Sequence, residues 1–144
     1  FVMALRVSYA QDLGIDLRAM MALSHLVSRL TGLEPAVNKP ILGKNAFRHE
    51  SGIHVQGLLG KDLRAFEPFP PAWIGRAHEV AFGKHSGRSN VRHLCREYGM
   101  SLSAAQEHEA LALIKTTAQR HRRELTKEEV LHALLKPWHR PLTA

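Results

Sequence analysis

The sequence predicts a mainly α fold, a helical subdomain in which short β or extended segments connect the helices. Two observations predict it: apolar residues recur at helical spacing in both ends of the chain, and prolines cluster in its middle. The 144 residues are 44% hydrophobic and 23% charged, which is ordinary for a globular protein with its own core.

The first region, residues 1–36, is predicted to form two helices. Apolar spacing indicates a short helix that ends at Gly14. Asp16 is then expected to cap a second helix, and Gly32 to end it. The proline-bearing stretch EPAVNKP cannot continue a helix and therefore marks the boundary. The apolar positions of the two helices are Val2, Leu5, Tyr9, Leu13, Leu17, Met20, Met21, Val27 and Leu30.

The second region, residues 37–85, is predicted to be a linker and a further subdomain. A short helix is expected from about Ser51 to Leu59, and a short strand from Glu79 to Phe82. Between them, the segment FEPFPPAWIGR carries three prolines and is expected to form a rigid loop.

The third region, residues 86–144, is predicted to be a small helical unit. Its first helix has apolar residues at positions i, i+3, i+4 and i+7 and is expected to stop at Gly99. Two capping-box patterns open further helices, and Pro137 is expected to close the last one. The residues behind these predictions are Val91, Leu94, Cys95 and Tyr98 for the first helix, and Ser103 with Gln106 and Thr126 with Glu129 for the capping boxes.

Composition limits the classes of protein to consider. The single Cys95 excludes an intramolecular disulfide and a cysteine-based zinc site, so we expect a reducing, cytoplasmic setting. No apolar run reaches the roughly 20 residues that span a bilayer, and no leader pattern is visible, so no membrane partner is expected. The chain opens on Phe1 inside a helical pattern, and we expect it to be part of a longer protein.

The formal net charge of +7 raises the alternative of a basic nucleic-acid binder. The basic residues are dispersed, however, and their densest run, at 120–123, falls at an expected helix end, where cations complement the helix dipole. We therefore expect no nucleic-acid partner. A helical dimerisation module without chemistry of its own stays open as a second alternative.

The stretch NAFRHESGIHVQG gathers His49, Glu50, Ser51 and His54 within six residues. It resembles the HExxH zinc-protease motif, but the two histidines are five residues apart, which on a helix turns them roughly 140° from each other. Paired cysteines are also lacking, so no metal site and no structural zinc are expected in this chain.

The stretch GKHSGR places Lys84, His85 and Arg88 in a glycine turn after the expected strand. It is not a P-loop, because the order GxxxxGKS/T is absent. An anion-binding turn and a plain connection from strand to helix both remain open.

Together, the stretches NKPILGKNAFRHESGIHVQGLL, FEPFPPAWIGR and GKHSGR resemble the region just after the catalytic barrel in the homocitrate synthase and 2-isopropylmalate synthase family. The resemblance implies that this chain is the C-terminal fragment of a TIM-barrel enzyme, with residues 1–36 as the last barrel helices. Such enzymes condense acetyl-CoA with a 2-oxo acid. Their divalent metal (Mg, Mn or Zn), held by an Asp and a His-x-His pair, would lie on the barrel upstream of Phe1.

The resemblance also implies a homodimer in which residues 37–85, as a linker and active-site-capping subdomain, cross to the partner's active site. His54 would then be catalytic, since an imidazole can donate a proton or hydrogen bond to a thioester or keto oxygen. Glu50 would assist it as a second catalytic residue. The expected substrate-binding residues are His49, Ser51, Lys84, His85 and Arg88.

Two departures bear on the substrate. Phe66 stands where many family members carry a Tyr whose hydroxyl accompanies the histidine, and a phenyl ring cannot make that hydrogen bond. The chain also ends soon after Pro137, whereas long 2-isopropylmalate synthases continue into a regulatory domain. We therefore expect a short homocitrate synthase of the kind associated with nitrogen-fixation cofactor assembly, with 2-isopropylmalate and citramalate synthases as the alternatives in amino-acid biosynthesis.

Overall fold

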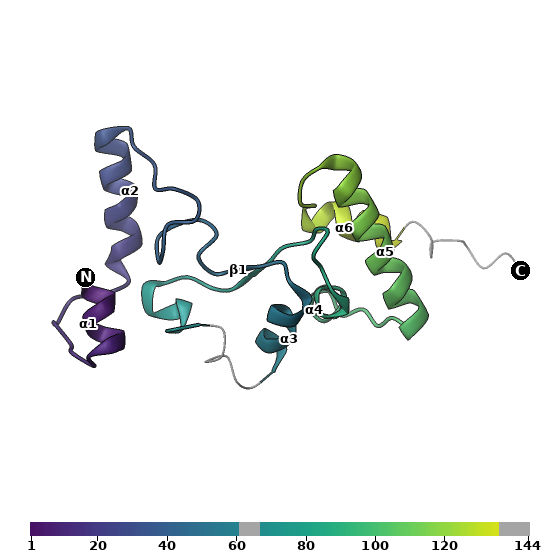
Figure 1. The fold of residues 1–144 in the computed structure, drawn as a ribbon, viewed down its shortest axis with the longest axis horizontal. Helices are drawn as coiled ribbons and strands as arrows, with labels where there is room; N and C mark the ends of the chain where they lie inside the picture. The colour runs from purple at the N-terminus through teal and green to yellow at the C-terminus, as the bar shows by residue number, and fades with distance from the viewer. Residues whose placement is uncertain (61–66, 136–144) are drawn as a thin grey trace, which may run out of the picture. The chain divides into compact units, whose positions relative to one another are not determined.

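The computed structural model describes residues 1–60 and 67–135, and confirms the mainly α fold (Figure 1). The predictions for Phe66 and Pro137 lie outside the described residues. None of the helices in these two ranges combines the length and the apolar character that crossing a membrane requires. The elements, in chain order, are α1 (Val2–Ser8), α2 (Ala19–Thr31), β1 (Arg48–His49), α3 (Gly52–Leu59), the 3-10 helix η2 (Pro71–Ile74), β2 (Glu79–Val80), α4 (Arg88–Glu97), α5 (Ala104–His121) and α6 (Lys127–Leu135).

The chain divides into two compact units, each built from two stretches of sequence. Unit 1 comprises residues 1–48 and 64–79, and unit 2 comprises residues 49–63 and 80–144. Strands β1 and β2 form a two-stranded sheet, in which the Glu79 amide donates to the Phe47 carbonyl in unit 1 and the Ala81 amide to the His49 carbonyl in unit 2. The division into three regions, with boundaries after residues 36 and 85, stays a prediction.

Unit 1 is held together by a small aromatic core and one arginine. The rings of Phe47 and Phe69 meet edge to face at 5.6 Å. Arg76 lies over the Phe47 ring and donates to the carbonyls of Gly43 (2.7 Å) and Lys44 (2.9 Å). The loop that contains η2 thereby fixes the turn that leads into β1.

The two N-terminal helices are shorter than predicted. Helix α1 ends at Ser8 because Ala10 takes a left-handed conformation with φ of 53°, well before Gly14. Helix α2 begins at Ala19, and the Asp16 carboxylate instead accepts from the amide of Arg18 in the turn before it. The predicted end of α2 is confirmed, with Gly32 at φ of 71°.

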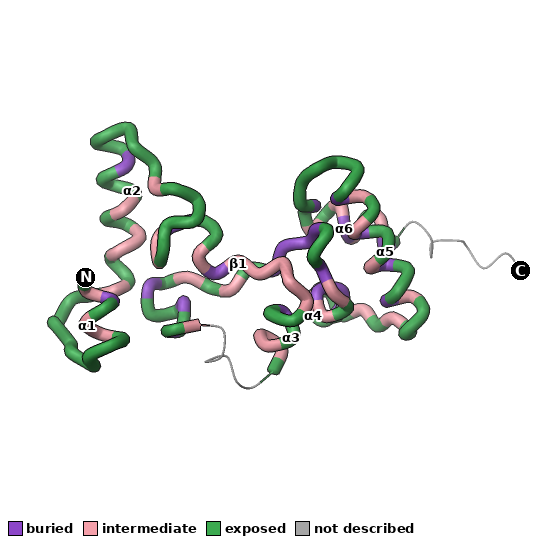
Figure 2. The backbone as a smooth tube through the Cα atoms, in the orientation of Figure 1, coloured by how far each residue is buried: buried purple, intermediate pink, exposed green. Residues whose placement is uncertain are grey.

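An apolar face of α2 is exposed within unit 1, where Figure 2 shows most of the helix in the exposed or intermediate colour. Leu23 is 60% and Leu30 is 77% exposed. A run of large apolar side chains along one helix marks a surface that commonly packs against another element.

Unit 2 is a chain of packed helices with one core. Helix α3 packs on α4, α4 on α5, and α5 on α6 (Figure 1). The Leu125 amide donates to the Phe82 carbonyl, which ties the segment after β2 to the connection between α5 and α6. Among the core side chains, five are at most 1% exposed along the helices: Val55, Val91, Leu94, Ile114 and Val130.

Both predicted capping boxes form. The Ser103 amide donates to Gln106 Oε1, and the Gln106 amide to Ser103 Oγ. At α6, the Thr126 amide donates to Glu129 Oε2 and the Glu129 amide to Thr126 Oγ1. Arg123, just after α5, donates through both terminal nitrogens to the Glu129 carboxylate.

These bonds make a pH-dependent contribution to stability. The hydrogen bonds from Arg123, and then the Thr126 amide, lower the pKa of Glu129 to about 2. Because the pKa in the folded state lies below that in the unfolded state, the stabilisation is complete above the unfolded pKa and is lost as the pH falls toward 2.

We expect Glu129→Gln to lower the unfolding temperature at pH 6, and the difference from the wild type to shrink at pH 3. The glutamine side chain can still accept the hydrogen bond from the Thr126 amide, so the variant measures the effect of removing the negative charge alone. The control is Glu109→Gln, at an exposed position on α5 without an ion pair in the described chain. The unfolding temperatures are measured by thermal melts. If the difference between Glu129→Gln and the wild type were the same at pH 6 and pH 3, the ionised Glu129 carboxylate would not be the source of the stabilisation.

Candidate functional site

Two segments of unit 2 bring together the residues that the sequence singled out. One runs from the end of β1 into the first turn of α3, residues 49–54, and the other comprises the turn before α4 and the first turn of that helix, residues 83–90. The Glu50 carboxylate accepts a hydrogen bond of 2.9 Å from the His85 amide. Glu50 therefore joins the two motifs directly, although 35 residues separate these positions.

The buried side chain of Asn90 fixes the same junction. Its Oδ1 accepts from the Gly87 amide (2.8 Å), and its Nδ2 donates to the carbonyls of Glu50 (2.9 Å) and Ala81 (3.0 Å). Asn90 is fully buried; its bond to the Ala81 carbonyl is buried, and its bonds to the Gly87 amide and the Glu50 carbonyl are part-buried. Sequence reasoning missed Asn90. The Gly-x-x-Asn spacing could have identified it, because this spacing places the Asn90 side chain at the third helical position. From there its oxygen accepts a hydrogen bond from the amide of the N-cap residue, Gly87.

Glycines allow the two segments to approach at backbone distance. A Cβ on Gly52 would lie 2.5 Å from the Gly87 Cα, closer than any side chain could fit. A Cβ on Gly83 would meet the Glu50 carboxylate. The buried Ser86, which accepts from the Gly83 amide (2.9 Å), closes the turn.

His49 and His54 lie against each other, with ring centroids 6.1 Å apart and planes at 76°. The angle of about 140° would apply only to two residues on one helix, and His49 is in β1, before α3 begins, so helical geometry does not relate the two histidines. His49 is half-buried, whereas His54 is exposed on the first turn of α3. Ser51 is at the N-cap of α3, although its hydroxyl makes no capping bond.

The basic residues of the second motif face two different hollows. His85 and Arg88 line one hollow together with Ser51; we call it the Arg88 groove, and its volume is about 510 Å³. Lys84 lines the other, of about 510 Å³, with Glu50 and the basic residues that follow α5. The Arg88 groove is lined by Ser51, Gly52, Ile53, Gln56, His85, Gly87, Arg88, Ser89 and Arg92.

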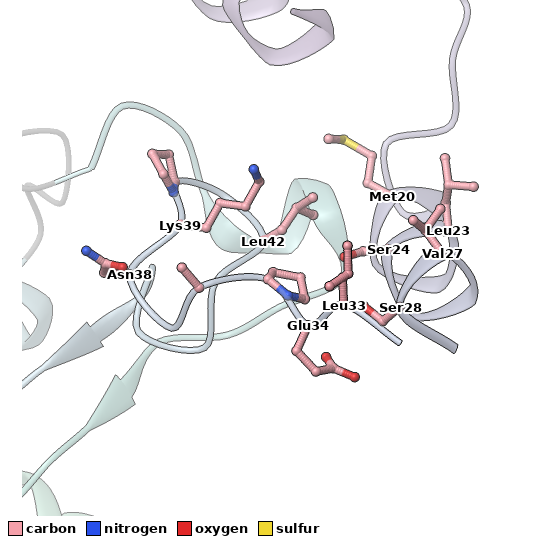
Figure 3. A pocket seen from close by; sticks show the side chains of 13 residues that line it. Met20, Leu23, Ser24, Val27, Ser28, Leu33, Glu34, Asn38, Lys39 and Leu42 are labelled. Carbon is pink, nitrogen blue, oxygen red and sulfur yellow. The ribbon is translucent and has the colours of Figure 1, made fainter. Parts of the chain in front are cut away.

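A third hollow, of about 670 Å³, lies in unit 1 between α2 and the segment after it (Figure 3). Leu23, Val27, Leu33 and Leu42 give it a mainly apolar wall. It contains none of the predicted site residues and no histidine or cysteine.

The described residues do not fit a divalent metal, because no group of three or more His, Cys, Asp or Glu among them is placed to hold one. Cys95 is buried, and that burial raises the pKa of its thiol, which makes it a core residue and a poor nucleophile. The titratable side chains that the two segments bring together are those of His49, Glu50, His54, Lys84, His85 and Arg88.

Comparison with known proteins defines the class of this chain. Residues 41–122 match a family described as "Homocitrate synthase post-HMGL domain-like". The matched range contains both segments of the site. The chain belongs to this family.

Curated relatives carry three related names. A putative (R)-citramalate synthase of Methanosarcina acetivorans is 43% identical over 79% of this chain, and a probable 2-isopropylmalate synthase of Methanopyrus kandleri is 38% identical over 79%. Homocitrate synthase 1 of a Nostoc species is 37% identical over 91%. The chain covers 23%, 23% and 34% of these proteins, respectively. All three relatives are named as synthases.

Proposed function

We propose that this chain is the C-terminal part of an acyltransferase that condenses acetyl-CoA with a 2-oxo acid and converts the acyl group into an alkyl group. The observation that carries the proposal is the exposed His54, presented on a segment that a buried asparagine and a glycine contact hold in place. The described residues include no group of three or more side chains placed to hold a metal ion. A histidine segment held by these contacts is therefore suited to completing a site whose other groups lie elsewhere.

We propose that His54 donates a proton to the keto oxygen of the 2-oxo acid. In the condensation, the methyl carbon of the acetyl group loses a proton and bonds to the keto carbon of the 2-oxo acid, and the keto oxygen becomes an alkoxide that must gain a proton. An imidazole near this oxygen can donate a hydrogen bond as charge develops and then supply the proton.

The other predicted residues would position His54 and bind substrate. Glu50 links the two motifs through the His85 amide, and His49 packs edge-on against the His54 ring. We assign Glu50 to the catalytic segment, and His49 with Ser51 to substrate contact. Lys84, His85 and Arg88 would attract anionic substrate groups.

We further propose that the enzyme is a cytoplasmic homodimer in which His54 serves the partner's active site. The exposed position of His54 on α3 supports a role toward a substrate outside its own unit. The exposed apolar face of α2 supports packing of unit 1 on a further part of the enzyme.

The substrate we propose is 2-oxoglutarate, with homocitrate as product. The alignment with the Nostoc homocitrate synthase extends over 131 residues of this chain, compared with 114 for the citramalate and 2-isopropylmalate synthases named above. Pyruvate and 2-oxoisovalerate, the substrates of citramalate and 2-isopropylmalate synthesis, are the alternatives.

A chimera tests the proposed function. In this chimera, residues 1–144 replace the part of the Nostoc homocitrate synthase that aligns with this chain. The chimeric enzyme is assayed for CoA release from acetyl-CoA with each of the three 2-oxo acids. We expect acetyl-CoA-dependent turnover, with the highest kcat/KM for 2-oxoglutarate. A folded, dimeric chimera without turnover on any of the acids would contradict the proposal.

A further inference from the structure

We propose that residues 37–45, which lie between α2 and β1, form a two-state strap along the hollow in unit 1. In the wound state the strap closes one wall of the hollow, and in the extended state it releases this wall. The inference concerns only residues of unit 1 and does not depend on the proposed condensation. Three observations carry it: a strained turn, the contacts that hold this turn, and the position of the strap beside α2.

The strained turn is centred on Ile41. Its φ is 71°, and the Leu42 amide donates to the Pro40 carbonyl at 2.8 Å. A hydrogen bond over two residues with a positive φ between them defines the rare, strained form of the γ-turn. Among residues 1–60 and 67–135, Ile41 is the only β-branched residue with a positive φ, a conformation that a branched side chain fits poorly. The backbone at Ile41 therefore favours a more extended form.

Backbone contacts inside the strap hold it in the wound state. The Gly43 amide donates to the Lys39 carbonyl (2.9 Å), and the Asn45 amide to the Val37 carbonyl (2.8 Å). A Cβ on Gly43 would lie 2.5 Å from the Lys39 oxygen and 2.7 Å from the Val37 oxygen, so only glycine fits at this place. Both hydrogen bonds enclose the γ-turn, and they break together when the turn extends.

Two side chains tie the wound strap to the rest of unit 1. Ile41 is half-buried against the aromatic core. Arg76, whose side chain is 12% exposed, donates to the carbonyls of Gly43 and Lys44. The burial of one apolar side chain and the backbone strain at one residue are effects of similar size and opposite sign. The two Arg76 bonds therefore decide how strongly the wound state is favoured.

The strap and α2 line the hollow from two sides (Figure 3). Asn38, Lys39 and Leu42 belong to the strap, whereas Leu23 and Val27 belong to α2. The γ-turn folds the chain back on itself, but each residue of an extended chain spans about 3.3–3.6 Å. Extension therefore moves the strap side of the hollow and leaves the α2 side in place. The state of the strap sets the width of the hollow.

Amide hydrogen exchange of the 144-residue chain tests the strain. Ile41→Ala and Ile41→Gly both remove the apolar side chain from the core, but only glycine adopts a positive φ without strain. We expect the amides of Leu42, Gly43 and Asn45 to be protected about fivefold or more better in Ile41→Gly than in Ile41→Ala. The matched control is Ala46→Gly, at a position without a positive φ, where glycine should lower the protection.

Arg76→Gln tests how the strap is held. The variant lacks two charge-assisted hydrogen bonds, so exchange at the same three amides should become about tenfold faster or more. Methyl relaxation dispersion should detect the opening at Leu42 and Leu23, on the two sides of the hollow, with one common rate. Arg29→Gln removes the same charge from α2 outside the hollow and should change neither measurement.

Three results would overturn the proposal. Equal protection in Ile41→Ala and Ile41→Gly would show that position 41 is not strained. Unrelated exchange rates of the three amides in the wild type would exclude one concerted opening. Methyl signals that do not respond to Arg76→Gln would separate the strap from the hollow.

Thermal melts check that each variant is folded. If the variants at position 41 were unfolded, the wild type and Arg76→Gln would decide the proposal. None of these measurements requires turnover, so failure of the condensing activity and failure of the strap are distinguishable.

Discussion

Replacing His54 by alanine in the chimera is expected to lower turnover about 10²–10³-fold, the range typical for loss of one donor to a developing oxyanion. The unfolding temperature should hardly change, because the His54 side chain is exposed and its removal opens no cavity in the core. The measurements are steady-state kinetics with 2-oxoglutarate and thermal melts. His108→Ala, at an exposed histidine of α5, is the control and should retain full turnover. Unchanged turnover in His54→Ala would remove this residue from the mechanism.

Subunit mixing separates action on the partner from action within one chain. One parent carries His54→Ala with an intact barrel, and the other keeps His54 but has its barrel metal ligands replaced. If His54 serves the partner, heterodimers contain one complete site and two inactive parents yield partial activity. Heterodimers that are demonstrated with differential tags and yet remain inactive would exclude the crossed arrangement.

The parts of the fold that could be predicted from the sequence depend on local signals. Gly32 ends α2 in a left-handed conformation, and the capping boxes at Ser103 and Thr126 open α5 and α6, because each signal acts within one helical turn. The period of the apolar residues likewise located Val91, Leu94 and Cys95 on the buried face of α4, whereas Tyr98 follows the helix and is 47% exposed. The start of α2 was misplaced because the Asp16 carboxylate bonds two residues ahead in a turn, a choice that residue type alone does not distinguish from a cap.

The site was only partly predictable because its geometry depends on contacts between distant residues. The motif sequences identified Glu50 and His85, but the bond between them joins positions that no local pattern relates. Likewise, no local pattern relates Gly52 to Gly87, although their backbones are in contact. Lys84 and Arg88 are four residues apart in one motif, yet they line different hollows. Asn90 escaped notice because an asparagine inside a helical pattern is more often a surface residue.

Asn90→Ala is expected to lower the free energy of unfolding by about 3 kcal/mol, since it leaves one buried and two part-buried backbone groups without their partner, and a buried group left unpaired costs about 1–3 kcal/mol. The substitution leaves the Gly87 amide and the carbonyls of Glu50 and Ala81 without the bonds that the side chain makes. Chemical denaturation of the 144-residue chain measures the effect. The matched control is Asn38→Ala, which removes the same side chain from an exposed position and should change the free energy of unfolding by less than about 0.5 kcal/mol.

The same substitution also tests whether this junction positions the histidine segment. In the chimera, at a temperature where Asn90→Ala is still folded, we expect a lower kcat because the released Glu50 carbonyl no longer anchors the turn that leads to His54. Asn90→Asp keeps an acceptor for the Gly87 amide but cannot donate to the carbonyls of Glu50 and Ala81. We therefore expect it to restore neither the stability nor the kcat. If Asn90→Ala were as stable as Asn38→Ala, the hydrogen bonds of Asn90 would be dispensable. If it lost stability but kept full kcat in its folded fraction, Asn90 would support the fold without positioning His54.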